Sequence, residues 1–303
     1  MKKVLLKMIV LAILLAGLNQ VYRHFFFPAD LVQFSPVMEQ VAIAKDSAHI
    51  VYLGESSNFT FRDEDADKRS ISLFTAEYFP EIPFLTIQNA ASHAGIYHTL
   101  LKNLQGSAPL KTVIVTLNLR SFNANWVYSK LETSLQKSMV LPSSGPALWR
   151  RFRLSFRDFE IKTNMERQAQ FKAAWAKQSL HYPSKNPHKT VLDWEKEVLN
   201  TGIYNADGSR NRKLSTLATH YVKTYAFHID TLTHPRIRDY DRIVALAQEQ
   251  GWKLTFLLIP ENISRAAELV PDLPWIMRQN RDLLVSRYQR MGVKVVDLLE
   301  LLP

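Results

Sequence analysis

The sequence predicts an α/β fold: a three-layer sandwich on a mostly parallel five-stranded sheet, with one N-terminal transmembrane helix. Five short runs are apolar almost throughout, as in strands covered on both faces: residues 49–53, 84–87, 112–117, 253–259 and 293–296. Helical patterns lie between them, at residues 71–78, 94–104, 237–249 and 275–291. Gly251 and Gly292 follow the last two, as is typical of helix ends. This alternation predicts parallel strands joined by right-handed crossovers.

Residues 1–27 predict a signal anchor. Lys2, Lys3 and Lys7 accompany an apolar run, and no acidic residue occurs before Asp30. The 19 positions from Val4 to Tyr22 are about enough to cross a bilayer core. Residues 16–19 fit the small-residue pattern of a cleavage site poorly, which favours an uncleaved anchor over a signal peptide. The lysines predict a cytoplasmic N-terminus and an exported domain over residues 28–303. A short buried helix of a soluble protein is the alternative.

The composition excludes several kinds of chemistry. The chain has 303 residues, a formal net charge of +10 and no cysteine, so covalent chemistry must use an oxygen, a lysine amine or a histidine. Histidine pairs such as His181 and His188 lack carboxylates at ligand spacing, so no metal site is expected, and no cofactor is predicted. Basic and aromatic residues form no nucleic-acid-binding motif, and export makes nucleic acid an improbable partner.

The strand and helix rhythm breaks over residues 123–235, which we interpret as an insertion between the third and fourth strands. A basic aromatic segment lies within it, at residues 149–153. Two interpretations stay open. The segment contacts a membrane or an acidic glycan, or it is a solvated helix whose aromatic side chains pack on the domain.

Polar residues follow the first three predicted strands. The first strand runs into Gly54-Glu55-Ser56-Ser57-Asn58, the second leads to Gly95, and the third ends at Asn118. The ligand crevice of a parallel α/β sheet lies at these carboxyl ends. A serine that opens a helix there can place an oxyanion near backbone N–H groups. The alternative is that Ser56, Ser57 or Asn58 caps a helix.

These residues resemble the SGNH (GDSL-type) esterase and acyltransferase superfamily. Gly54-Glu55-Ser56 is similar to its Gly-Asp-Ser block, with Glu in place of Asp, and this resemblance implies that Ser56 is the nucleophile. It also implies that Gly95 and Asn118 help to bind the oxyanion, although Thr116 and Leu119 replace the glycine and aspartate of the third block. We further expect substrate contacts from Ser57, Asn58, Glu261 and Asn262, the last two at the end of the fourth strand.

The layout of anchor and domain resembles membrane-tethered proteins that work beside membrane-bound O-acyltransferases in alginate O-acetylation and teichoic-acid D-alanylation. The resemblance implies a serine esterase or O-acyltransferase that acts on acyl esters of a cell-surface polysaccharide. It implies a single-pass protein of the bacterial cytoplasmic membrane with a periplasmic domain. The expected partners are the membrane, the polysaccharide and a membrane-bound O-acyltransferase.

One departure from the family pattern concerns the catalytic base. The family places an Asp-x-x-His pair after its last strand, but here Asp297 is followed by Glu300, and no histidine occurs after His234. Three explanations stay open. The chain is truncated and lacks its C-terminal end; another histidine, among them His93, His228 and His234, supplies the base; or the protein is an inactive SGNH-like module that binds glycan or a membrane acyltransferase.

Overall fold

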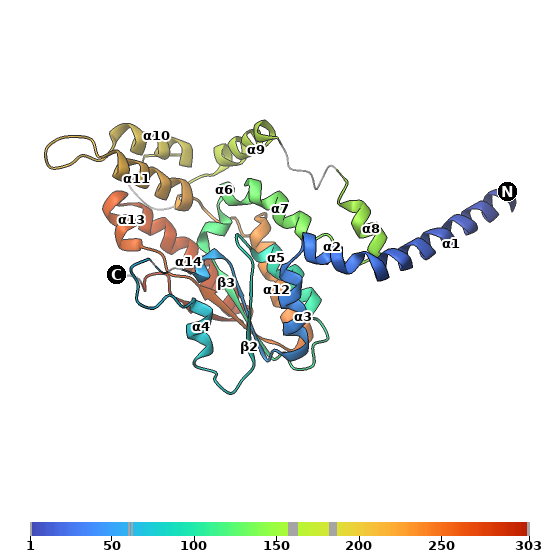
Figure 1. The fold of residues 1–303 in the computed structure, drawn as a ribbon. Helices are drawn as coiled ribbons and strands as arrows, with labels where there is room; N and C mark the ends of the chain where they lie inside the picture. Colours follow the sequence, from blue (N-terminus) through green and yellow to red (C-terminus); the bar gives the residue numbers. More distant parts are fainter. Residues whose placement is uncertain (1, 60, 62, 157–162, 182–186, 302–303) are drawn as a thin grey trace.

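The computed structural model describes residues 2–59, 61, 63–156, 163–181 and 187–301, and Figure 1 shows its fold. Five parallel strands form one sheet in the order β2-β1-β3-β4-β5. Their bounds are β1 Ile50–Gly54, β2 Phe84–Gln88, β3 Thr112–Leu117, β4 Lys253–Leu258 and β5 Lys294–Asp297. In register, Val51 lies opposite both Leu85 and Val113. The predicted α/β class and parallel sheet are confirmed.

Four helices cover one face of the sheet: α3 (Val37–Ser47), α5 (Ala94–Leu104), α12 (Pro235–Gln250) and α14 (Leu273–Arg290). Alternate strand residues such as Val115 and Phe256 enter this core and are fully buried, because successive strand side chains point to opposite faces. The Phe256 ring contacts Tyr240 of α12 and Tyr288 of α14, at centroid distances of 5.2 and 4.8 Å.

The opposite face carries α4 (Ile71–Ala76). Phe79, just beyond this helix, stacks on Phe84 of β2 at 6.2 Å. Ile114 and Leu257 line an open depression on this face and are only partly buried. Near-continuous apolar strands therefore predicted the parallel pairing correctly, but the third layer that the described residues form is thin and carries the short helix α4.

In the described part of the segment between β3 and β4, six helices precede α12 and lie within the predicted insertion. They are α6 (Ala124–Val127), α7 (Lys130–Ser138), α8 (Ala147–Arg153), α9 (Asn164–Lys177), α10 (Val191–Thr201) and α11 (Arg212–Tyr225). In Figure 1, α6, α7, α9, α10 and α11 lie above the sheet, whereas α8 lies beside α1. The described residues also form the short helix α13 (Ile263–Leu269) and two 3-10 turns, η1 (Ser56–Asn58) and η2 (Leu119–Phe122).

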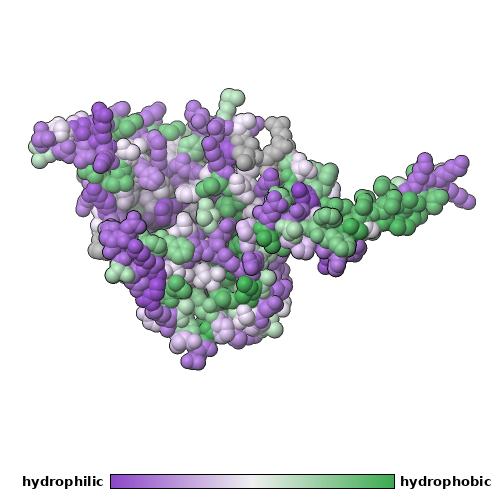
Figure 2. All heavy atoms as spheres, in the orientation of Figure 1, coloured by the Kyte–Doolittle hydropathy of each residue, from purple (hydrophilic) through white to green (hydrophobic). Residues whose placement is uncertain are grey.

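The N-terminal helix α1 (Lys2–Phe25) projects from this body and is followed by α2 (Phe27–Phe34). Its apolar window has a mean hydropathy of 2.1, and none of that window is buried against the protein. Figure 2 shows hydrophobic side chains along the helix and hydrophilic ones at its free end. The helix is long and apolar enough to cross a membrane, consistent with a single-pass anchor.

Candidate functional site

A small cavity of about 50 Å³ lies at the carboxyl ends of β1, β2 and β3. Each strand contributes residues that follow it, and α6, α7 and the start of α12 close the other side. The lining residues are Glu55, Ser56, Ala91, Ser92, His93, Asn118, Arg120, Ser121, Trp126, Ser129, Leu131, Glu132, Leu135 and Arg236. The chain therefore brings Ser56 and Asn118 of the predicted site together.

Ser56 is the exposed residue of the turn after β1, whereas Glu55, Ser57 and Asn58 are buried. The Ser56 hydroxyl donates to Glu55 Oε2 at 2.9 Å. Ser57 donates its hydroxyl to the same carboxylate through Oε1, and its backbone N–H to Oε2 at 3.1 Å. The turn thus places Ser56 at the cavity, whereas both donors of Ser57 are hydrogen-bonded to the Glu55 carboxylate.

Glu55 is an ionised anchor for this turn. Burial alone would raise the pKa of its carboxyl, but hydrogen bonds from Ser57, Asn118 and Ser56 outweigh burial and lower the pKa below its usual value. Asn118 Nδ2 donates to Glu55 Oε1 at 2.9 Å. A carboxylate with a lowered pKa is a weak base, so Glu55 orients the Ser56 hydroxyl and the Asn118 amide.

Asn58 ties the turn to two other elements. Its Nδ2 donates to Ser72 Oγ at 2.9 Å and to Gln88 Oε1 at 2.8 Å, and its Oδ1 accepts from Ser72 N at 2.8 Å. The side chain is only 1% exposed. Its predicted contact with substrate stays a prediction, and in this structure its polar atoms join β1, α4 and the end of β2.

We expect Asn58→Ala to lower the free energy of unfolding by about 2 kcal/mol, because it leaves the buried partners on Ser72 and Gln88 unsatisfied. Urea unfolding of the detergent-solubilised full chain, followed by tryptophan fluorescence, measures the change. Asn103→Ala is the matched control, since Asn103 is half-exposed on α5 and only donates to Thr99 O. Equal losses in the two variants would contradict the anchoring role of Asn58.

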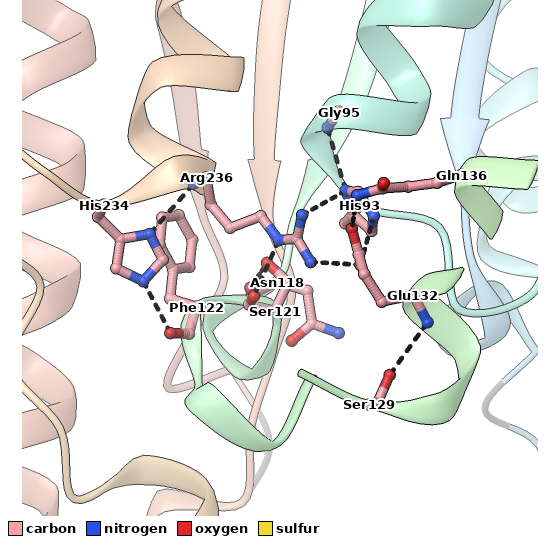
Figure 3. A network of polar contacts seen from close by, with 10 residues as sticks. All are labelled: His93, Gly95, Asn118, Ser121, Phe122, Ser129, Glu132, Gln136, His234 and Arg236. Carbon is pink, nitrogen blue, oxygen red and sulfur yellow. Dashed lines mark hydrogen bonds and ion pairs between the residues drawn. The ribbon is translucent and has the colours of Figure 1, made fainter. Parts of the chain in front are cut away.

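His93 forms the second wall of the cavity, as part of a buried charged cluster (Figure 3). Arg236 Nη1 lies 2.8 Å from His93 Nδ1, which also accepts from Gly95 N at 3.1 Å. His93 Nε2 lies 2.9 Å from Glu132 Oε2, and the same carboxylate oxygen is 2.8 Å from Arg236 Nη2. Since Nδ1 accepts, the ring is neutral and its proton sits on Nε2, facing Glu132.

The protonation states in this cluster follow from burial and from its partners. Burial lowers the pKa of His93, with Arg236 adding to the effect and Glu132 opposing it. Burial would raise the pKa of Glu132, but His93 and Arg236 lower it to about 2. Burial raises the pKa of nearby Asp239. Glu132 is therefore the charge that balances Arg236, which is 3% exposed.

Gly95 lies in the first turn of α5, and its N–H is engaged by the His93 side chain that caps the helix. A Cβ at Gly95 would come within 2.9 Å of Asp239 Oδ2 and 3.1 Å of the His93 ring. Close packing of these side chains explains why a glycine suits this position. Its predicted role as an oxyanion donor stays a prediction.

Glu261 reaches the cavity through Arg120. Arg120 lines the cavity, and its Nε lies 3.2 Å from Glu261 Oε1. Tyr225 donates its hydroxyl to Glu261 Oε2 at 2.5 Å. Burial raises the pKa of Glu261, although Arg120 and Tyr225 oppose this. Asn262 caps α13 through Arg265 N at 2.8 Å. Their predicted substrate contacts stay predictions.

Among the histidines that the structure describes, His93 is the one that lines this cavity. His234 caps α12 by accepting from Arg236 N, and its Nε2 lies 2.8 Å from Phe122 O. His228 packs edge-on against the ring of His181. At the end of β5, Asp297 accepts from Leu299 N, and Glu300 pairs with Arg278.

Sequence reasoning did not find Arg120, Trp126, Glu132 or Arg236, all of which line the cavity. Arg120 had a usable signal, because it lies two residues after Asn118 at a strand end. Glu132 and Arg236 had none, since they lie 104 residues apart and meet only through the fold. Ala91, beside them, has a φ of 58°, which is costly for a residue with a Cβ.

Comparisons with protein-family models, curated proteins and solved structures found no match to this chain.

Proposed function

We propose that the protein is a membrane-anchored serine esterase or O-acyltransferase that acts on acyl esters of a cell-surface polysaccharide, in the periplasm of a bacterium. The observation that carries the proposal is the exposed Ser56 hydroxyl, held by Glu55 at the carboxyl end of β1 in a cavity beside Asn118. This is the location where a parallel sheet presents a reacting group to its ligand.

In the proposed reaction the Ser56 Oγ attacks the ester carbonyl carbon and gives up its proton to a base. The tetrahedral intermediate then expels the alcohol, which regains a proton, and leaves an acyl group on Ser56. Water or a polymer hydroxyl removes that acyl group in the second half of the cycle. The Ser56 N–H and Asn118 Nδ2 supply donors for the oxyanion, because the amide nitrogen has a second hydrogen besides the one that it donates to Glu55.

The cavity also favours a polar substrate, since carboxylates and guanidinium groups lie together on its lining. Arg120 and Arg236 place two guanidinium groups on its lining. Trp126 is 37% exposed at the same cavity and offers a flat apolar face beside them. A charged polar lining with an exposed indole is suited to an acylated sugar.

A fluorophosphonate probe tests the nucleophile directly, because it reacts with activated serines. We expect one adduct on Ser56 of the full chain in detergent, located by peptide mass spectrometry, and its loss in Ser56→Ala. Ser107→Ala is the matched control and should keep the adduct, since the Ser107 hydroxyl donates to Lys45 O. If circular dichroism shows that the wild-type protein is folded and Ser56 gains no adduct, Ser56 is not the nucleophile.

One observation favours a second candidate, an inactive SGNH-like module that binds glycan or a membrane acyltransferase. His93 Nδ1 accepts from Arg236 and Gly95, and Nε2 lies 2.9 Å from Glu132, while the Ser56 hydroxyl donates to Glu55 and not to this histidine. A serine without a base is a weak nucleophile. Under this candidate Ser56→Ala leaves glycan binding unchanged and the fluorophosphonate gives no adduct.

A further inference from the structure

We propose that helix α8 lies on the lipid surface beside α1, with the rings of Trp149, Phe152 and Phe156 inserted at the level of the headgroups. We call these three rings the aromatic foot. The proposal does not depend on the chemistry at Ser56. It rests on three features: how α8 is fixed to α1 and α2, which side chains it leaves exposed, and where along α1 the contact occurs.

Polar contacts fix α8 to the N-terminal helices. Leu148 N donates to Asn19 Oδ1 of α1 at 2.9 Å. Arg151 Nε lies 2.9 Å from Asp30 Oδ2 of α2, and Tyr22 donates its hydroxyl to the same oxygen at 2.7 Å. The position of α8 is thereby tied to that of α1.

Apolar packing reinforces this attachment. The guanidinium of Arg150 lies 4.6 Å from the centre of the Phe27 ring. A second buried cluster, separate from the main core, joins the residues before and after α8 to α2. In it, Val140, Leu141 and Leu154 pack with Phe27, Leu31 and Phe34. Arg150 and Arg151 therefore face α2, whereas Arg153 contacts Ser143, and the aromatic foot lies on another side of α8.

Two rings of the aromatic foot are exposed and Phe156 is partly exposed, although all three side chains are apolar. Trp149 is 50% exposed and Phe152 is 54% exposed. Their rings lie 5.6 Å apart, and Phe156 is 5.8 and 5.1 Å from them. Spacings of three and four residues place the three on one side of the chain. Three large rings gathered in water are unfavourable, so this patch indicates an apolar partner.

The position along α1 identifies that partner as lipid. If Val4 to Tyr22 crosses the bilayer core, Asn19 lies near the end of the span that adjoins the exported domain. Phe25 and Phe26 follow, 70% and 58% exposed. Tryptophan and other amphipathic aromatics concentrate at this depth, where a ring can bury its body while its polar edge stays hydrated. A helix fixed beside Asn19 must meet the same interface.

The charge near this interface suits an anionic bilayer. Arg23, Arg150, Arg151 and Arg153 lie in or beside the contact between α1 and α8, where Asp30 is the acid that pairs with Arg151. Basic residues near a surface of anionic lipid each gain about 1 kcal/mol. We therefore expect the aromatic foot to bind more firmly when the vesicles contain phosphatidylglycerol.

Tryptophan quenching tests the proposal on the full chain. The protein is reconstituted in vesicles of phosphatidylcholine and phosphatidylglycerol whose acyl chains are brominated near the headgroup, because bromine quenches indole on contact. We expect quenching in the wild type that is lost in Trp149→Phe. The matched control, Trp275→Phe on α14, should retain it, since Trp275 is similarly exposed at 46%. Equal quenching in both variants would overturn the proposal.

A second measurement uses the absence of native cysteine. A polarity-sensitive dye is attached to Phe152→Cys and, as control, to Leu199→Cys, which is 50% exposed on α10 at the other end of the molecule (Figure 1). In the same vesicles we expect a blue-shifted emission at position 152 and not at position 199. A dye at position 152 that stays in water would overturn lipid as the partner and favour a protein partner.

Discussion

Glu132→Gln is expected to lower the free energy of unfolding by about 3 kcal/mol. The substitution keeps the shape of the side chain but removes the charge that balances Arg236, a guanidinium 3% exposed. Removing one partner of a buried ion pair costs about 3 to 5 kcal/mol, because the other charge stays buried without compensation. We expect the lower end of this range, since Asp239 also acts on Arg236.

Urea unfolding of the detergent-solubilised full chain measures this loss. The control is Glu195→Gln, because Glu195 pairs at 2.8 Å with Lys223, whose side chain is 42% exposed. Glu195 is 18% exposed, but its partner Lys223 stays solvated when the charge is removed, so the control should lose about 1 kcal/mol or less. A loss below about 1 kcal/mol in Glu132→Gln would show that water or another group compensates Arg236.

Acid is expected to destabilise the domain already between pH 6.5 and 5, mainly through His234. Burial lowers the pKa of His234 to about 4, with Arg236 adding to the effect, while Phe122 O and Asp230 oppose it. In the unfolded chain, His234 takes up a proton below the ordinary histidine pKa of about 6.5. In the folded chain, it stays neutral until the pH falls to about 4. Stability is therefore complete above pH 6.5 and falls as the pH drops toward 4, by up to about 3 kcal/mol.

The measurement is the free energy of unfolding at a series of pH values for the wild type and His234→Asn. Asn can still cap α12 through Arg236 N but does not titrate, so the slope between pH 6.5 and 5 should flatten. His49→Asn is the control, since the His49 side chain is exposed. An unchanged slope in His234→Asn would assign the acid sensitivity to another buried histidine, with His93 the first to examine.

The strands were predictable because their signal is local. The run at residues 112–117 matches β3 exactly in extent, and residues 94–104 match α5. Strand placement also predicted that Ser56 and Asn118 would meet, since carboxyl ends of parallel strands share one edge. Those arguments need only periodicity and the direction of the strands.

The charged wall of the cavity was not predictable, for a physical reason. Arg236 and His93 lie 143 residues apart, and each has the surroundings of an ordinary polar residue in the sequence. Only the packing of α7 and α12 against the β2 end buries them and shifts the pKa values of Glu132 and His93. The sequence also gave no sign that His93 caps α5, because Ser, Thr, Asp and Asn are the usual residues at the N-terminal cap.

The small cluster around α2 has a practical consequence for soluble versions of the protein. Phe27, Leu31 and Phe34 cover Val140, Leu141 and Leu154, which are at most 5% exposed. Cutting the chain after residue 34 would expose those three side chains and remove Asp30 from Arg151. A cut just before Phe27 keeps this packing, so secreted versions should begin there to preserve the wall that α7 gives the cavity.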